Sequence, residues 1–100
     1  MLFRSILTTD QQTIINSPIN KFWQSALKQG AIARTWGDCF GYYMVCKGEA
    51  ELMTDTSLKP HDILPLIPIL KGAGVEIHKI DCEDYSNIIA CKKGVMEKLR

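Results

Sequence analysis

Asp62 is the residue of this chain whose setting best suits chemistry. The sequence Lys-Pro-His-Asp runs directly into the apolar segment Ile-Leu-Pro-Leu-Ile-Pro-Ile-Leu, which places this carboxylate where a helix is expected to begin. An aspartate at that point commonly caps the helix by accepting a backbone N–H, and spacing alone favours this interpretation. The same carboxylate is also a hard oxygen ligand of the kind that Mg²⁺ takes, together with waters and a substrate phosphate.

Gly37 and Asp38 open a second apolar segment and allow two interpretations as well. A glycine before a helix lets a ligand approach the backbone closely, and the exposed N–H groups of the first turn attract anions. A turn followed by an aspartate cap is the simpler interpretation of a single Gly-Asp pair. Within the segment, Phe40, Tyr43 and Met44 fall at helical spacing and predict a core stripe.

Several kinds of site are not indicated by the sequence. It contains no GxSxG, P-loop, HExxH or GxGxxG motif. His61 and His78 stand alone, as surface or partly buried hydrogen-bonding histidines do. The four cysteines form no C-x-x-C pair and have no histidine at zinc-finger spacing, so we expect reduced thiols.

Strands and helices are expected to alternate along the chain. Strands are predicted over 2–7, 31–35, 49–53, 75–80 and 86–91. Helices are predicted from 17 or 18 to 30, over 38–48, over 62–73, and from 92 or 93 onward. Pro65 fits a first helical turn, whereas Pro68 should bend the third helix or delay its regular part. This order predicts a single α/β domain over 1–100, with a layered mixed sheet flanked by helices.

Composition and charge exclude some classes of partner. The 12 Lys and Arg residues and 11 Asp and Glu residues form no long run of one sign, which argues against nucleic acid. No apolar run approaches the roughly 20 residues that span a bilayer, so no membrane association is expected. With no signal peptide at its start, the chain is expected to be cytoplasmic.

Three segments carry a family resemblance. ARTWGDCFGYYMVCKGEAELMTD, LKPHDILPLIPILKGAG and SNIIACKKGVMEKL together resemble, in order and spacing, the C-terminal part of the inositol monophosphatase family, from about Leu7 to Leu99. The GDC-aromatic-GY run and the LKP-x-D-x-x-x-L-x-P segment are most similar to the histidinol-phosphate phosphatase branch. The fold that this implies is the C-terminal subdomain of the inositol monophosphatase fold.

The resemblance implies a role for each candidate site residue. Asp62 takes the position of a ligand for catalytic Mg²⁺, and Asp55 takes that of a contact to the alcohol portion of the substrate. Gly37, Asp38 and Cys39 match a substrate-facing helix entry. The implied reaction is the hydrolysis of a small phosphorylated alcohol such as histidinol phosphate or inositol phosphate, whose hydroxyl or amino groups Asp38 and Asp55 would bind.

The chain also departs from the family pattern. The family's N-terminal half, with its glutamate motif and its D-P-[LI]-D-G-T motif, is not in this sequence. His61 stands where an aromatic residue is usual, and Lys71 and Gly72 replace an acidic pair. A lone Asp62 should bind Mg²⁺ weakly, so little or no activity is expected from this chain by itself.

The partners expected on this basis are the missing N-terminal half or a second copy of the chain, because loss of the half should expose an apolar surface. One alternative is a non-enzymatic remnant of a split or decaying gene that persists as a folded, self-associating protein. Another is an unrelated α/β binding module.

Overall fold

The computed structural model describes residues 5–35, 38–56 and 58–99, with only the backbone described at 38 and 39. Its elements confirm the α/β class with a mixed sheet. They are β1 (Ser5–Thr8), α1 (Gln11–Ile15), α2 (Asn20–Lys28), β2 (Ile32–Thr35), α3 (Asp38–Cys46), β3 (Leu52–Asp55), α4 (Pro60–Ile63), η1 (Leu64–Leu66), α5 (Ile67–Gly72), β4 (Val75–Lys79), β5 (Ile88–Lys92) and α6 (Val95–Leu99).

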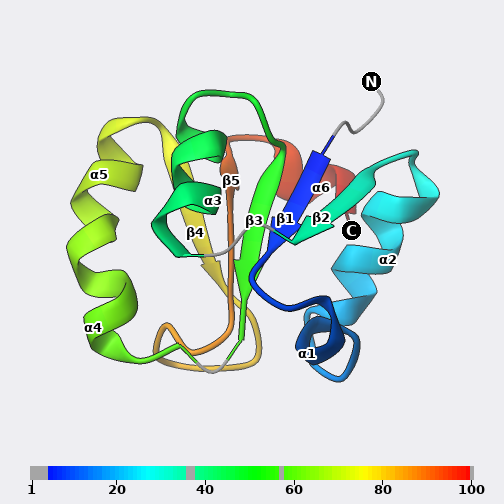
Figure 1. The fold of residues 1–100 in the computed structure, drawn as a ribbon, viewed down its shortest axis with the longest axis horizontal. Coiled ribbons are helices and arrows are strands. Elements are labelled where there is room, and N and C mark those ends of the chain that lie inside the picture. Colours follow the sequence, from blue (N-terminus) through cyan, green and yellow to red (C-terminus); the bar gives the residue numbers. More distant parts are fainter. Residues whose placement is uncertain (1–4, 36–37, 57, 100) are drawn as a thin grey trace.

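The strands form one sheet in the order β2-β1-β3-β5-β4 (Figure 1). Strand β1 pairs in parallel with both β2 and β3, whereas β5 is inserted antiparallel between β3 and β4. The first four strands therefore run in one direction, and their carboxyl ends lie at the same edge of the sheet. None of the helices in the described ranges is long and apolar enough to cross a membrane.

Helices cover both faces of this sheet, as Figure 1 shows: α1, α2 and α6 on one face, and α3, α4 and α5 on the other. Successive strand side chains point to opposite faces, and both sets are buried. Ile6 and Leu52 join the cluster under α2 and α6, whereas their neighbours Leu7 and Met53 join the cluster under α3 and α5. A strand buried on both faces reads as a continuous apolar run.

Among the differences from the predictions, two have a clear physical reason. Helix α1 follows β1 almost at once, because Asp10 caps it by accepting the Gln12 N–H at 2.9 Å; this short helix was not predicted. Strand β3 extends to Asp55, two residues past the predicted end, because Thr54 Oγ1 donates to the Ile88 carbonyl at 2.7 Å and so is satisfied inside the sheet. A polar residue at a strand end can be buried when it has such a partner.

The predicted helix over 62–73 is three consecutive pieces that begin at Pro60. Pro65 lies in the 3₁₀ turn η1, and Pro68 lies in the first turn of α5, where a missing N–H costs no intrahelical hydrogen bond. Of the two outcomes expected for Pro68, a bent helix or a delayed regular part, the second is found, because α5 begins only at Ile67.

The predicted core stripe of α3 was wrong for Phe40 and Tyr43, whereas Met44 is partly buried against the core. Phe40 and Tyr43 are each 54% exposed, whereas Tyr42 and Val45 are buried. Nearly every residue of this helix is apolar, so its hydrophobic spacing does not identify the buried face.

Candidate functional site

A crevice is expected where the chain reverses its direction of travel across the sheet. From β1 the chain moves to β2 through α1 and α2 on one face of the sheet, and it then returns past β1 to β3 through α3 on the other face. After β3 it continues into α4 and α5, which lie on the same face as α3. The loops that leave the carboxyl ends of the neighbouring strands β1 and β3 therefore lead to opposite faces. In open α/β sheets such a switch point, at the carboxyl ends of the strands, is where ligands bind.

A cavity of about 550 Å³ occupies this switch point. It lies between the loop after β1, the end of β3 and the start of α4, and α3 contributes to its wall. Its lining residues are Thr9, Asp10, Thr13, Tyr42, Asp55, Thr56, Leu58, His61, Asp62 and Leu66. The structure thus brings together two of the predicted site residues, Asp55 and Asp62.

Asp55 is a buried carboxylate, 6% exposed, at the last position of β3. Its Oδ2 accepts a hydrogen bond from the Tyr42 hydroxyl at 2.8 Å, and its Oδ1 accepts one from the Thr9 backbone N–H at 3.2 Å. Burying a carboxylate is costly unless hydrogen bonds compensate for lost water. Asp55 consequently joins three elements at the cavity wall: the loop after β1, helix α3 and strand β3.

Asp62 lies at the mouth of the cavity with its side chain 45% exposed. Its Oδ2 accepts the Lys59 backbone N–H at 3.1 Å, and its Oδ1 lies 3.4 Å from His61 Nε2. The helix begins at Pro60, two residues before the predicted start, so Asp62 is in the first turn and not at the N-cap position. It nevertheless performs a capping interaction, because it satisfies the N–H of Lys59.

Tyr42, Thr9 and Asp10 were not predicted as site residues. No spacing signal in the sequence singles out Tyr42, because nearly every residue of α3 is apolar; the structure buries it together with Val45 on one side of the helix. Asp10 follows the carboxyl end of β1, a parallel strand, and ligands of open α/β sheets bind at such ends. Which strands neighbour β1 could not be known from the sequence.

The predicted helix entry is only partly described. Gly37 lies outside the described residues, and Asp38 and Cys39 are described as the first two backbone positions of α3. Helix α3 follows β2 at the same sheet edge as the cavity. The substrate-binding roles of Gly37, Asp38, Cys39 and Asp55 therefore stay predictions, as does metal binding by Asp62.

The described side chains do not fit a magnesium ion by themselves. In those parts of the chain, no three His, Cys, Asp or Glu residues approach closely enough to hold a metal. Mg²⁺ demands a near-octahedral set of oxygen ligands and gives up its waters reluctantly, so Asp62 alone is insufficient.

The curated proteins that the chain matches in sequence are phosphatases. The chain is 30% identical over 70 residues to the histidinol-phosphatase of Chlorobaculum parvum, a match that covers 70% of this chain and 27% of that protein. It is 40% identical over 37 residues to the chloroplastic bifunctional phosphatase IMPL2 of Arabidopsis thaliana, covering 37% of this chain and 11% of that protein. The chain is related to the inositol monophosphatase family, on its histidinol-phosphatase-like side. No protein-family model matches it.

Superposition on solved structures shows that this chain has the fold of part of an inositol monophosphatase. An inositol monophosphatase from Zymomonas mobilis superposes with a TM-score of 0.72 at 19% identity, covering 95% of this chain and 40% of that one. SaIMPase-II with bound inositol monophosphate gives 0.69 at 16% identity, covering 98% of this chain and 41% of the other. This inositol-monophosphatase-like chain thus spans about a quarter or less of the curated relatives' length and about two fifths of the solved chains.

Proposed function

We propose that this chain forms the alcohol-binding side of a phosphomonoester hydrolase, and that hydrolysis requires further residues from outside it, on a longer chain or a separate one. The observation that carries this proposal is the cavity at the switch point of the sheet, which Asp55 and Asp62 both line. The chain's relatives are phosphatases, which makes phosphate-ester hydrolysis the best-supported reaction.

Asp62 is placed where it could contribute to a site formed jointly by this chain and the missing phosphatase half. Its carboxylate is nearly half exposed at the cavity mouth, and its capping bond to Lys59 uses one oxygen and fixes the side chain. A metal ligand needs such a fixed orientation. We propose that Asp62 supplies one oxygen ligand to Mg²⁺ and that residues absent from this chain supply the rest. A Mg²⁺ ion held in this way would supply polarisation of the phosphate ester and activation of a water.

The lining of this cavity provides the groups that an alcohol-binding site needs. Thr9, Thr13 and Thr56 line it beside the Asp55 carboxylate, so hydroxyl and carboxylate groups can hydrogen bond to a polyol or an amino alcohol. A cationic amine would pair with negative charge there, which favours a substrate of the histidinol phosphate type. Inositol phosphate is the alternative substrate among small phosphorylated alcohols.

Exposed apolar side chains indicate where the complementary residues would pack. Phe40 and Tyr43 of α3, Leu64 of η1 and Ile69 of α5 are each more than half exposed. All four come from the helices that cover one face of the sheet. Large apolar side chains collected on one side commonly mark an interface. We propose that this surface, the α3/α5 surface, contacts the missing phosphatase half.

The test is reconstitution. This chain, the amino-terminal part of the Chlorobaculum histidinol-phosphatase, and their mixture are each assayed for Mg²⁺-dependent phosphate release from histidinol phosphate and inositol monophosphate. The proposal expects release from the mixture and none from either part alone. A mixture that associates in sedimentation yet releases no phosphate would contradict it, and would favour a non-enzymatic remnant.

A further inference from the structure

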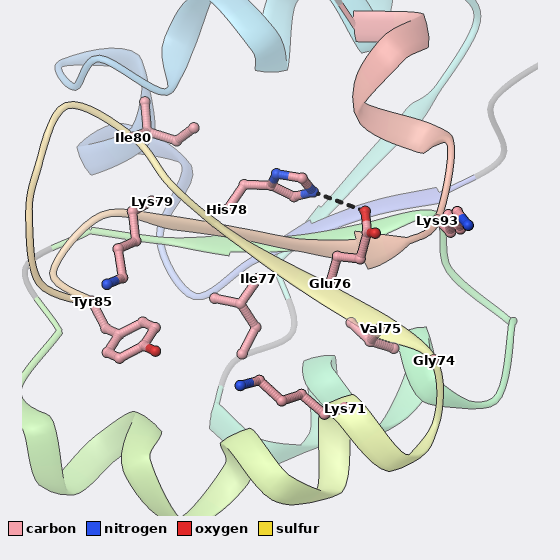
Figure 2. Close-up of a pocket in the computed structure, with 10 residues that line it drawn as sticks. All are labelled: Lys71, Gly74, Val75, Glu76, Ile77, His78, Lys79, Ile80, Tyr85 and Lys93. Carbon is pink, nitrogen blue, oxygen red and sulfur yellow. Dashed lines mark hydrogen bonds and ion pairs between the residues drawn. The ribbon is translucent and has the colours of Figure 1, made fainter.

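The outer edge of β4 is an open strand edge beside a hollow. Strand β4 pairs with β5 on one side, and no strand within the described ranges pairs with its other side. The hollow beside it measures about 790 Å³ (Figure 2). It shares no lining residue with the cavity of Asp55 and Asp62, so it is a separate feature of the surface.

The hydrogen-bond pattern identifies the backbone groups that face this open edge. Ile80 N donates to Asn87 O at 2.9 Å, in the same register as the β4–β5 ladder. In an antiparallel ladder the hydrogen-bonded pairs alternate, so the even-numbered residues of β4 point their N–H and C=O groups at β5. The odd-numbered residues point theirs outward. These residues are Val75, Ile77 and Lys79.

The surroundings of this edge are positively charged. Lys71 from α5, Lys79 from β4 and Lys93 after β5 line the hollow with a single carboxylate, that of Glu76. Glu76 Oε1 is already 3.3 Å from His78 Nε2 on the same side of the strand (Figure 2). An excess of ammonium groups attracts negative charge and repels a partner of the same sign.

We propose that the outer edge of β4 binds an extended peptide segment rich in carboxylates, by strand addition. The outward backbone groups would supply the main-chain hydrogen bonds. Every second side chain of the added strand would lie on the face of Ile77, next to Lys71 (Figure 2), and these positions suit glutamate or aspartate. A second copy of the chain fits less well, because its β4 edge is flanked by the same three lysines. This inference does not depend on the proposed phosphatase function.

The experiment titrates the ¹⁵N-labelled chain with the peptide acetyl-Glu-Thr-Glu-Val-Glu-Thr-amide. We expect the amide resonances of the three outward residues to shift and their hydrogen exchange to slow. A matched peptide with glutamine in place of glutamate should bind at least about tenfold more weakly, because it lacks the charge attraction. A matched lysine peptide should produce no shift.

Two variants locate the binding. Ile77→Pro removes an N–H that points to the partner and not to β5, so it should abolish binding; Ile77 also packs against the core, so the resonances of α1, α2 and α6 on the opposite face serve to show that the fold is retained. Lys71→Glu leaves β4 unaltered and should weaken binding about tenfold. Lys28→Glu, on the exposed part of α2, is the control and should bind normally.

Three results would overturn the proposal. They are equal binding of the acidic and lysine peptides, no shift of the three amides at millimolar acidic peptide, and self-association of the chain through the same amides without peptide.

Discussion

The hydroxyl of Tyr42 donates a hydrogen bond to Oδ2 of Asp55 at 2.8 Å, between helix α3 and the last residue of β3. Both residues are buried, and both line the cavity at the switch point. The contact thus serves the fold and the candidate site together, because it holds a buried carboxylate in a fixed position at the cavity wall.

Removing this donor should destabilise the chain. Tyr42→Phe leaves the buried Asp55 carboxylate with one hydrogen bond fewer, which should lower the free energy of unfolding by about 1.5–3 kcal/mol. Urea denaturation measures the loss. Tyr43→Phe is the matched control, since Tyr43 is 54% exposed, and it should change stability by less than about 0.5 kcal/mol. Equal losses in the two variants would mean that the bond to Asp55 contributes nothing.

Ile6 in the interior strand β1 should be far more important for stability than Ile32 in the edge strand β2. Ile6 is fully buried, whereas Ile32 is 58% exposed. Ile6→Ala removes packed methyl groups and leaves a cavity, at a cost of about 2–5 kcal/mol, whereas Ile32→Ala should cost under about 1 kcal/mol. Thermal and urea unfolding of the two variants test this; a similar cost for both would contradict the sheet order.

Stability should fall at alkaline pH because of Cys91. Burial raises the pKa of this thiol from 9.0 to about 12, with a further contribution from the Glu76 carboxylate. Below pH 9 the thiol is protonated in the folded and unfolded chains alike. Between the two pKa values only the unfolded thiol ionises, so the free energy of unfolding should drop by up to about 1.4 kcal/mol per pH unit as pH rises.

The comparison that isolates this effect is with Cys91→Ala, which lacks the thiol. Urea denaturation across the alkaline range should give a shallower fall for the variant than for the parent chain. Cys46 has its pKa raised in the same direction by burial and is retained in both proteins, so its effect cancels. Parallel stability curves would show that Cys91 is not shielded from water as the structure places it.

The α3/α5 surface should be needed for association with the complementary half. Ile69 of α5 is 63% exposed, so Ile69→Lys should leave stability within about 0.5 kcal/mol and yet weaken association at least tenfold. Ile15→Lys, at a 48% exposed position of α1 on the opposite face of the sheet, is the control. Sedimentation of each variant with the amino-terminal half measures the effect. Equal weakening by both substitutions would place the interface elsewhere.

The sequence predicted the class and order of most elements but not their arrangement. Apolar runs and turn residues located the strands, because buried strands of an α/β sheet are nearly continuous apolar segments. The order β2-β1-β3-β5-β4 depends on pairing between distant segments, which local patterns do not contain. Without that order, nothing in the sequence placed Thr9 beside Asp55.

The candidate site could be predicted in part. Asp62 and Asp55 were selected by a family resemblance, and the structure places both at one cavity. Tyr42 was missed for a physical reason: α3 is apolar on all sides, so helical spacing favoured Phe40 and Tyr43, which are exposed. Asp62 also shows that capping and ligand interpretations are compatible, because a carboxylate that accepts the Lys59 N–H still faces the cavity.

The most direct test of the central claim is phosphate release by the reconstituted mixture in which this chain carries Asp62→Asn. The control is Glu49→Gln, an exposed carboxylate paired with Lys47 just before β3, at the end of that strand away from the cavity. If the switch-point cavity is half of a phosphatase site, Asp62→Asn should lower kcat by at least about 100-fold at unchanged association, while Glu49→Gln retains activity. Full activity of the Asp62→Asn mixture would contradict the claim that this cavity contributes to catalysis.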